Sequence, residues 1–246
     1  VIINMGGLPL LEHYALGKAI QQAVQVSGKR VAIIGSGDLS HCLSDKAPGG
    51  YHQEAHRFDE AVAELLRSQQ VQGLPTLEEL AGVAGECGLR PLAVFLGCFD
   101  GLAGEHQVLS YEAPWGVGYL VATRQVVAGA GPSYLDKFLA ERQEAIEEQR
   151  AGESQPVQLA RLVVESYVRT GRIPKQLPKL PTELPPRAGA FVTIHKYGQL
   201  RGCIGTTEAT RPTLAEEIAR NAVSAASDDP RFEPIGKEEL PHLVYS

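Results

Sequence analysis

The sequence has 246 residues, of which 43% are hydrophobic and 21% charged, and its formal net charge is −6. This composition predicts one or two folded domains and excludes global disorder. Acidic and basic residues are interspersed, so no basic surface for nucleic acid is expected. No apolar run approaches the roughly 20 residues that a membrane helix needs, so no membrane partner is expected either.

The cysteines and the chain ends give two further expectations. Four cysteines lie scattered without CxxC spacing, which favours reduced thiols and a cytoplasmic protein. The chain begins with VIIN, without an initiator Met or a signal-peptide pattern, and ends in the strand-like HLVYS. We therefore expect a piece of a longer protein.

The first elements predict a layered α/β domain. VIIN (residues 1–4) is typical of a short buried strand, and apolar residues recur at helical spacing over residues 11–24, before Gly28. RVAIIGSG (residues 30–37) is a continuous apolar run flanked by glycine, typical of a strand buried on both faces. Strand, helix and strand in succession indicate layers of helix and sheet.

The middle of the sequence predicts two helices. One covers about residues 55–69, and the other opens at Pro75-Thr76, where Thr76 and Glu79 have capping-box spacing. LRPLAVFLGCF (residues 89–99) fits a helix or a strand equally.

The remaining sequence predicts a linker and a second, smaller α+β domain. Its expected elements are a hairpin over 106–127 around Pro114-Trp115-Gly116, helices over 134–150, 157–171 and 214–227, and two strands over 190–206 around Tyr197-Gly198. Thr213 and Glu216 form a second predicted capping box. The predicted domains are 1–127 and 154–246, with a helical linker over 128–153.

Chemistry-bearing residues follow the predicted strand at GSGDLSH, Gly35 to His41. Loops at the carboxyl end of a strand line the usual ligand crevice of an α/β sheet, and a His there moves protons near neutral pH. Asp38 is placed to orient His41 or accept its hydrogen bond. A plain turn with Asp or Ser as a helix cap explains the same pattern, and the missing third glycine argues against a dinucleotide loop.

Two other groups in the first domain have both functional and structural interpretations. Glu86 and Cys87 offer a carboxylate and a thiol as metal ligands, or else a solvated acid and a small buried thiol. His52 and His56 have i,i+4 spacing, but the glycines before them favour a loop that enters a helix.

In the second domain the segment LRGCIG has the same ambiguity. Cys203 between two glycines is a candidate nucleophile beside Arg201, with His195 as the nearby base. A small cysteine in a close-packed turn, with Gly202 and Gly205 admitting neighbouring backbone, is the favoured interpretation.

These motifs carry two resemblances. Residues 1 to about 125 resemble the C-terminal part of the B-type subunits of class III extradiol dioxygenases and of their MEMO-like relatives, through SGDLSH, ECGLRPLA and SY followed by GVGYLVA. Residues from about 154 resemble the first part of an AMMECR-type domain, through AGAFVTIHKYGQLRGCIGT and NAVSAASDDPRF. Together they resemble the fusion protein of the AmmeMemoRadiSam type.

The dioxygenase resemblance implies roles by position. His41 is implied as the acid/base, with Asp38 beside it, and Glu86, or in MEMO-like relatives Cys87, as the metal ligand. The two histidine ligands of the family lie upstream of Val1, so Fe(II) is expected in the intact protein but not tightly bound to these residues. We expect the 246 residues alone to be inactive.

Two functions follow from the resemblances. The first is a non-haem Fe(II) dioxygenase that acts on a catecholic or related aromatic substrate with O2. The second is a non-catalytic metal-binding or scaffold protein whose AMMECR-type domain contacts a partner such as a radical-SAM enzyme.

Overall fold

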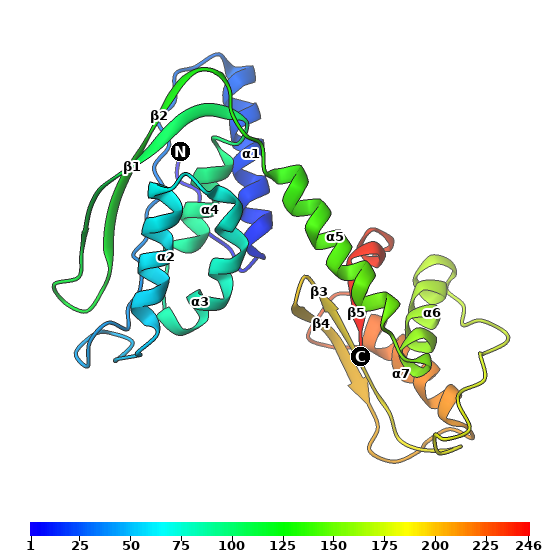
Figure 1. The fold of residues 1–246 in the computed structure, drawn as a ribbon. Helices are drawn as coiled ribbons and strands as arrows, with labels where there is room; N and C mark the ends of the chain where they lie inside the picture. Colours follow the sequence, from blue (N-terminus) through cyan, green and yellow to red (C-terminus); the bar gives the residue numbers. More distant parts are fainter. The chain divides into compact units, whose positions relative to one another are not determined.

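The computed structural model describes residues 1–246, which divide into two units, Val1–Ala140 (unit 1) and Glu141–Ser246 (unit 2). The division falls within helix α5 (Leu135–Ala151), and each unit has a hydrophobic core of its own. Figure 1 shows helices and small sheets in both units. The mixed helix-and-strand architecture predicted from the sequence is therefore confirmed.

Unit 1 is built mainly from helices. They are α1 (Leu10–Ser27), α2 (Ala55–Arg67), the 3-10 helix η1 (Val71–Thr76), α3 (Leu77–Ala84) and α4 (Leu89–Gly97). Helix α1 packs against α4 and ends at Gly28, which takes the left-handed conformation with φ 63°. The predicted helices at 11–24 and 55–69 are confirmed, and the undecided segment LRPLAVFLGCF is helical because its apolar residues pack as a helix stripe in the core.

A long antiparallel hairpin completes unit 1. Strand β1 (Leu102–Glu112) pairs with β2 (Tyr119–Ala130), and the turn between them carries Pro114-Trp115-Gly116, as predicted. The register places His106 opposite Arg124 and Tyr111 opposite Leu120. Figure 1 shows the hairpin extending along the helices of unit 1, where β1 contacts α2.

Two predicted strands are absent. Residues 1–4 and 30–37 form no strand, and Val31 and Ile34 are 49% and 87% exposed rather than buried. Their apolar residues favour extended backbone, but a strand also needs a neighbour to hydrogen-bond with. No other segment of the chain pairs with either of them.

The first predicted capping box is also wrong, although its helix exists. Thr76 precedes α3, but its backbone is helical and its hydroxyl donates to the Gly73 carbonyl at 2.8 Å instead of capping. The reason is that η1 runs directly into α3, so Thr76 lies inside a continuous turn rather than at a free helix start.

Unit 2 packs two helices on a three-stranded antiparallel sheet of order β4-β3-β5. Its elements are α6 (Gln155–Thr170), β3 (Phe191–Lys196), β4 (Gln199–Gly205), α7 (Leu214–Ser227), the 3-10 helix η2 (Lys237–His242) and β5 (Leu243–Tyr245). The predicted hairpin and helices are confirmed. So is the capping box, in which Thr213 Oγ1 accepts from the Glu216 amide at 3.2 Å and Glu216 accepts from the Thr213 amide.

None of these helices combines the length and the apolar character that crossing a membrane requires.

Candidate functional site

The loop that carries SGDLSH is fixed on two sides by backbone hydrogen bonds. On one side Leu39 donates to the Gly118 carbonyl at 2.9 Å, and Gly118 donates back to Ser40 at 2.8 Å. On the other side the His41 amide donates to the Ala84 carbonyl, the last residue of α3, at 2.8 Å. The loop therefore holds His41 between the start of β2 and the end of α3.

A buried carboxyl group supports the same loop. Asp59 on α2 is 1% exposed, and its Oδ1 accepts from the Ser40 amide at 2.8 Å while Oδ2 accepts from the Tyr111 hydroxyl at 2.7 Å. Burial raises the pKa of Asp59, although these two hydrogen bonds oppose the shift. Sequence reasoning missed this residue, and the available signal was an acid among the core positions of an amphipathic helix.

Two glycines bring the loop against the start of α4. A Cβ on Gly37 would lie 2.6 Å from the Cys87 carbonyl oxygen, and one on Gly88 would lie 2.7 Å from the Asp38 carbonyl oxygen. At this separation Asp38 and Cys87 are joined by three hydrogen bonds, the longest from Cys87 Sγ to the Asp38 carbonyl at 3.8 Å. The Asp38 amide donates to Cys87 Sγ at 3.2 Å, and the Cys87 amide donates to the Asp38 carbonyl at 3.2 Å.

This approach brings three chemical groups together. His41 Nε2 lies 3.8 Å from Asp38 Oδ2 and 3.8 Å from Cys87 Sγ, and the ligand atoms of the three residues all lie within 4.8 Å of one another. The His41 side chain is 25% exposed and that of Asp38 46%, so the cluster is open to solvent. We call Asp38, His41 and Cys87 the DHC cluster.

The geometry of the DHC cluster distinguishes a catalytic triad from a metal site. In a nucleophile–His–acid triad the acid and the nucleophile bond to different ring nitrogens. Here both lie nearest to the same nitrogen, Nε2, so the three groups converge on one point. An imidazole, a carboxylate and a thiol around one point fit a divalent transition metal and leave coordination positions for other ligands.

The neighbouring acid Glu86 lies outside this cluster. Its Oε2 accepts from the amide of Leu89, the first residue of α4, at 2.6 Å. The carboxylate thus satisfies a free N–H group at the helix start, where a negative charge is also favoured by the helix dipole. Of the two ligand candidates that the sequence left open, Cys87 is the one placed beside His41.

The other histidine pair does not form a site. His52 precedes α2, and its Nδ1 accepts from the Glu54 amide at 3.2 Å, whereas His56 lies within the helix. The interpretation of a loop that enters a helix is confirmed, because i,i+4 spacing aligns side chains only when both residues are helical.

In unit 2 the LRGCIG residues lie in strand β4 with their polar groups paired. Arg201 donates to Glu239 Oε1 and Oε2, both at 2.9 Å, and Arg231 and Asp229 surround the backbone of Cys203. A Cβ on Gly202 would lie 2.1 Å from the Ala225 carbonyl on α7, and one on Gly205 would meet the Phe191 ring at 2.3 Å.

Cys203 itself lies beside polar neighbours rather than a histidine. Its Sγ is 3.3 Å from Thr193 Oγ1, and its amide donates to Asp229 at 2.8 Å. Hydrogen bonding from Arg231 keeps the pKa of Asp229 well below its usual range, although burial opposes the shift. His195 pairs across the sheet with Leu200 and makes no hydrogen bond to Cys203. The segment is therefore a closely packed strand rather than the turn favoured from the sequence.

Comparison with known proteins agrees with the two resemblances. Residues 1–122 match the family described as catalytic LigB subunit of aromatic ring-opening dioxygenase, and residues 157–246 match the family described as AMMECR1. Protein CA_C1420 of Clostridium acetobutylicum is 35% identical over 249 residues, which cover 100% of this chain and 53% of that protein. The order of the two segments is therefore shared with this relative.

Other relatives match a shorter part of the chain. A protein of Thermotoga maritima is 50% identical over 95 residues, which cover 38% of this chain and 55% of that protein. The crystal structure of uncharacterized protein PH0010 from Pyrococcus horikoshii is 39% identical over 37% of this chain and 46% of its own, with a TM-score of 0.34. The chain thus spans about half the length of the relatives it matches. It therefore carries a segment similar to the LigB dioxygenase family, residues 1–122, followed by a segment similar to the AMMECR1 family, residues 157–246.

Proposed function

We propose that unit 1 contributes to a non-haem iron dioxygenase-like site for a catecholic or related aromatic substrate, with the DHC cluster at its centre. The observation that carries the proposal is the convergence of Asp38, His41 and Cys87 within 4.8 Å, on a segment of the LigB family. A bound Fe(II) would supply the redox chemistry by which the substrate reacts with O2.

The three residues of the DHC cluster would have different roles in this site. His41 would accept and return the substrate proton at Nε2, since imidazole is the commonest general acid and base and this side chain is partly exposed on the open side of the cluster. Asp38 would orient the protonated ring through its carboxylate at 3.8 Å. Cys87 Sγ would be a metal ligand, fixed by the hydrogen bond from the Asp38 amide.

The number of ligands sets the expected affinity. With Cys87 as the metal ligand, and His41 and Asp38 kept for the substrate proton, the site is incomplete compared with a closed four-ligand centre. We therefore propose that these residues bind divalent metal weakly, and that tight binding requires further ligands. A second candidate function, a scaffold that contacts a partner such as a radical-SAM enzyme through unit 2, applies if the cluster binds no metal.

The experiment is an anaerobic titration with Fe(II), and with Co(II) as a spectroscopic substitute that gives a sulfur-to-metal charge-transfer band. We expect saturable binding and a band that Cys87→Ser removes. Glu86→Gln and Cys203→Ser are matched controls that should keep the band, since Glu86 bonds to the start of α4 and Cys203 lies in unit 2.

Each outcome separates the two functions. Metal binding that is lost in Glu86→Gln but kept, without a charge-transfer band, in Cys87→Ser would assign the ligand to Glu86 and overturn this arrangement. No binding of either metal would leave the scaffold function. If metal binds, oxygen consumption with catechol that is lost in His41→Ala would support the enzyme over a non-catalytic metal-binding protein.

A further inference from the structure

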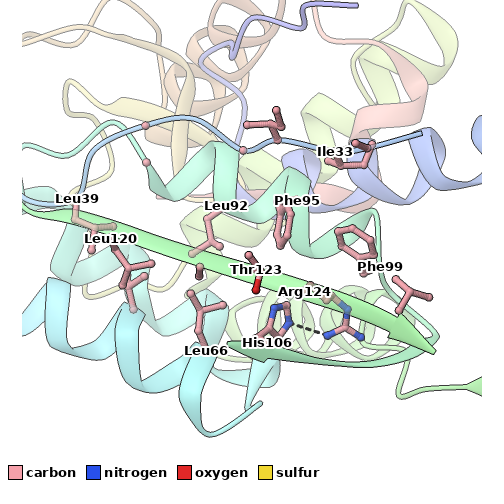
Figure 2. Close-up of a pocket in the computed structure, with 18 of the residues that line it drawn as sticks. Ile33, Leu39, Leu66, Leu92, Phe95, Phe99, His106, Leu120, Thr123 and Arg124 are labelled. Atoms are coloured by element: carbon pink, nitrogen blue, oxygen red, sulfur yellow. Dashed lines mark hydrogen bonds between the residues drawn. The ribbon is translucent and has the colours of Figure 1, made fainter. Parts of the chain in front are cut away.

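Unit 1 contains an elongated cavity of about 520 Å³ beside the DHC cluster. Its walls come from residues 31–35, from α2 and α4, and from the hairpin, and they are mainly aliphatic and aromatic. Figure 2 shows Leu39 and Leu120 toward one end, and Phe99 and Arg124 toward the other. The volume lies in the range of pockets that hold small organic ligands.

The far end of the cavity holds two polar side chains, the buried His106 on β1 and the partly buried Arg124 on β2. They pair across the hairpin, with Arg124 Nη1 2.8 Å from His106 Nε2, as Figure 2 shows. His106 is 6% exposed, and Arg124 Nη2 also donates to the Leu102 carbonyl at 2.8 Å. The pair is therefore held in place by the register of the two strands.

Each member of this pair retains one buried nitrogen without a partner, His106 Nδ1 and Arg124 Nε. Because a guanidinium only donates, His106 Nε2 must accept, and the proton of the neutral ring then lies on Nδ1. Burial and the nearby Arg124 lower the pKa of His106 to about 4, which agrees with a neutral ring. Both unpartnered atoms are thus N–H donors, and a buried donor without an acceptor is unfavourable.

The charge at this end is also unbalanced. The groups that Arg124 contacts are all neutral. The His106 imidazole and the Leu102 carbonyl hydrogen-bond to it, and the Phe99 ring centroid lies 5.7 Å from its guanidinium carbon. A positive charge and two free donors among apolar side chains are the chemistry that binds a carboxylate. The apolar remainder of the cavity suits a hydrocarbon body.

The length of the cavity determines which hydrocarbon would fill it. Leu39 hydrogen-bonds to Gly118 just before β2, and Arg124 lies six residues further along. At about 3.3 Å per residue this is a span of roughly 20 Å, far longer than one aromatic ring. Gly37 and Gly88 line the cavity and adjoin Asp38 and Cys87, so the end away from Arg124 lies next to the cluster.

We propose that this cavity binds an elongated apolar monocarboxylate, such as a medium-chain fatty acid, with its carboxylate on His106 and Arg124 and its tail toward Leu39. The site is distinct from the metal site and does not require metal. Because no member of the DHC cluster lines the cavity, failure of one proposal leaves the other standing.

The test is calorimetric titration of the metal-free chain with decanoate below its micelle concentration, and with 1-decanol as the uncharged counterpart. We expect saturable decanoate binding that Arg124→Met weakens at least about tenfold. Decanol should bind more weakly than decanoate to the unmodified protein and equally to both proteins. Arg67→Met, on the exposed end of α2, is the matched control and should leave decanoate binding unchanged.

A variant that blocks the cavity keeps the test decisive if Arg124→Met does not fold. Ala122 lines the middle of the cavity, and Ala122→Trp should abolish decanoate binding by filling it. The proposal is overturned if decanoate shows no saturable binding or binds no better than decanol. It is equally overturned if Arg124→Met, or Ala122→Trp where that variant is used, retains the unmodified affinity within about twofold.

Discussion

At the scale of single residues, the candidate site depends on glycines that have no side chain to keep two backbones apart. GSGDLSH predicted a loop at a ligand crevice or a plain turn, and the structure uses Gly37 for close approach to Cys87 and Gly88. The sequence predicted the participants but not the contact, because residues 38 and 87 are 49 positions apart. It also left Glu86 and Cys87 open, since the choice depends on where α4 begins.

Gly37→Ala tests this close approach. The new methyl group would lie 2.6 Å from the Cys87 carbonyl oxygen, a backbone atom that cannot rotate away. We expect a loss of about 1–3 kcal/mol in the free energy of unfolding of unit 1, and weaker Co(II) binding because Asp38 and Cys87 separate. Urea unfolding and metal titration measure the two effects.

The control for that substitution is Gly82→Ala in α3. A Cβ there meets no atom within 4 Å, so helix propensity should stabilise the variant by about 0.5–1 kcal/mol. If Gly37→Ala behaves like Gly82→Ala, the glycine is not required for the contact.

At the scale of elements, local signals predicted the helices and the two hairpins, but not whether an isolated strand pattern has a partner. Gly28 and the Thr213–Glu216 box end and begin helices through contacts within a few residues, so the sequence contains the whole signal. Residues 30–37 have a strand pattern without a partner, because pairing depends on distant segments. The contact between His106 and Arg124 likewise follows from the hairpin register, which composition does not specify.

The two predicted capping boxes form a natural comparison within one chain. Thr213→Ala removes the acceptor for the Glu216 amide and should cost about 1 kcal/mol in α7. Thr76→Ala removes only a hydroxyl that donates to Gly73, and should cost less than about 0.5 kcal/mol. Hydrogen exchange in the first turns of α7 and α3 measures each effect locally. Equal loss of protection in both helices would show that spacing alone, rather than the observed geometry, makes the cap.

At the scale of the whole molecule, the two units respond to acid over different ranges. Burial and Arg124 lower the pKa of His106 in unit 1 to about 4. In unit 2 burial alone would raise the pKa of Glu239, but Arg201, the Gly236 amide and Lys196 bring it to about 2. The pKa of Glu217 reaches about 2 mainly through the Thr206 hydroxyl, against burial. In each case the folded pKa is below the unfolded one, so acid removes stability.

The pKa values determine which unit loses stability first as the pH falls. The contribution of His106 is complete above its unfolded pKa of about 6.5 and disappears as the pH falls through about 4. Glu217 and Glu239 of unit 2 lose their contribution to stability only as the pH falls from about 4.3 to about 2. Asp59 acts in the opposite direction in unit 1, because its pKa is raised by burial and its ionised form destabilises the fold.

A His106→Gln variant isolates the histidine from Asp59, since both proteins contain the same aspartate. From pH 7 to about pH 4.5, unit 1 of the unmodified protein should lose on the order of 2 kcal/mol more unfolding free energy than unit 1 of the variant. Urea unfolding read by pulsed hydrogen exchange assigns the loss to peptides of one unit. Unit 2 should be equal in both proteins over this range, because its glutamates remain ionised. Parallel pH profiles in unit 1 would mean that His106 binds protons with the same pKa in the folded and the unfolded protein, so that below about pH 6.5 its Nδ1 and Nε2 would both be donors. The pairing of Nε2 with Arg124, from which the carboxylate site was inferred, would then be wrong.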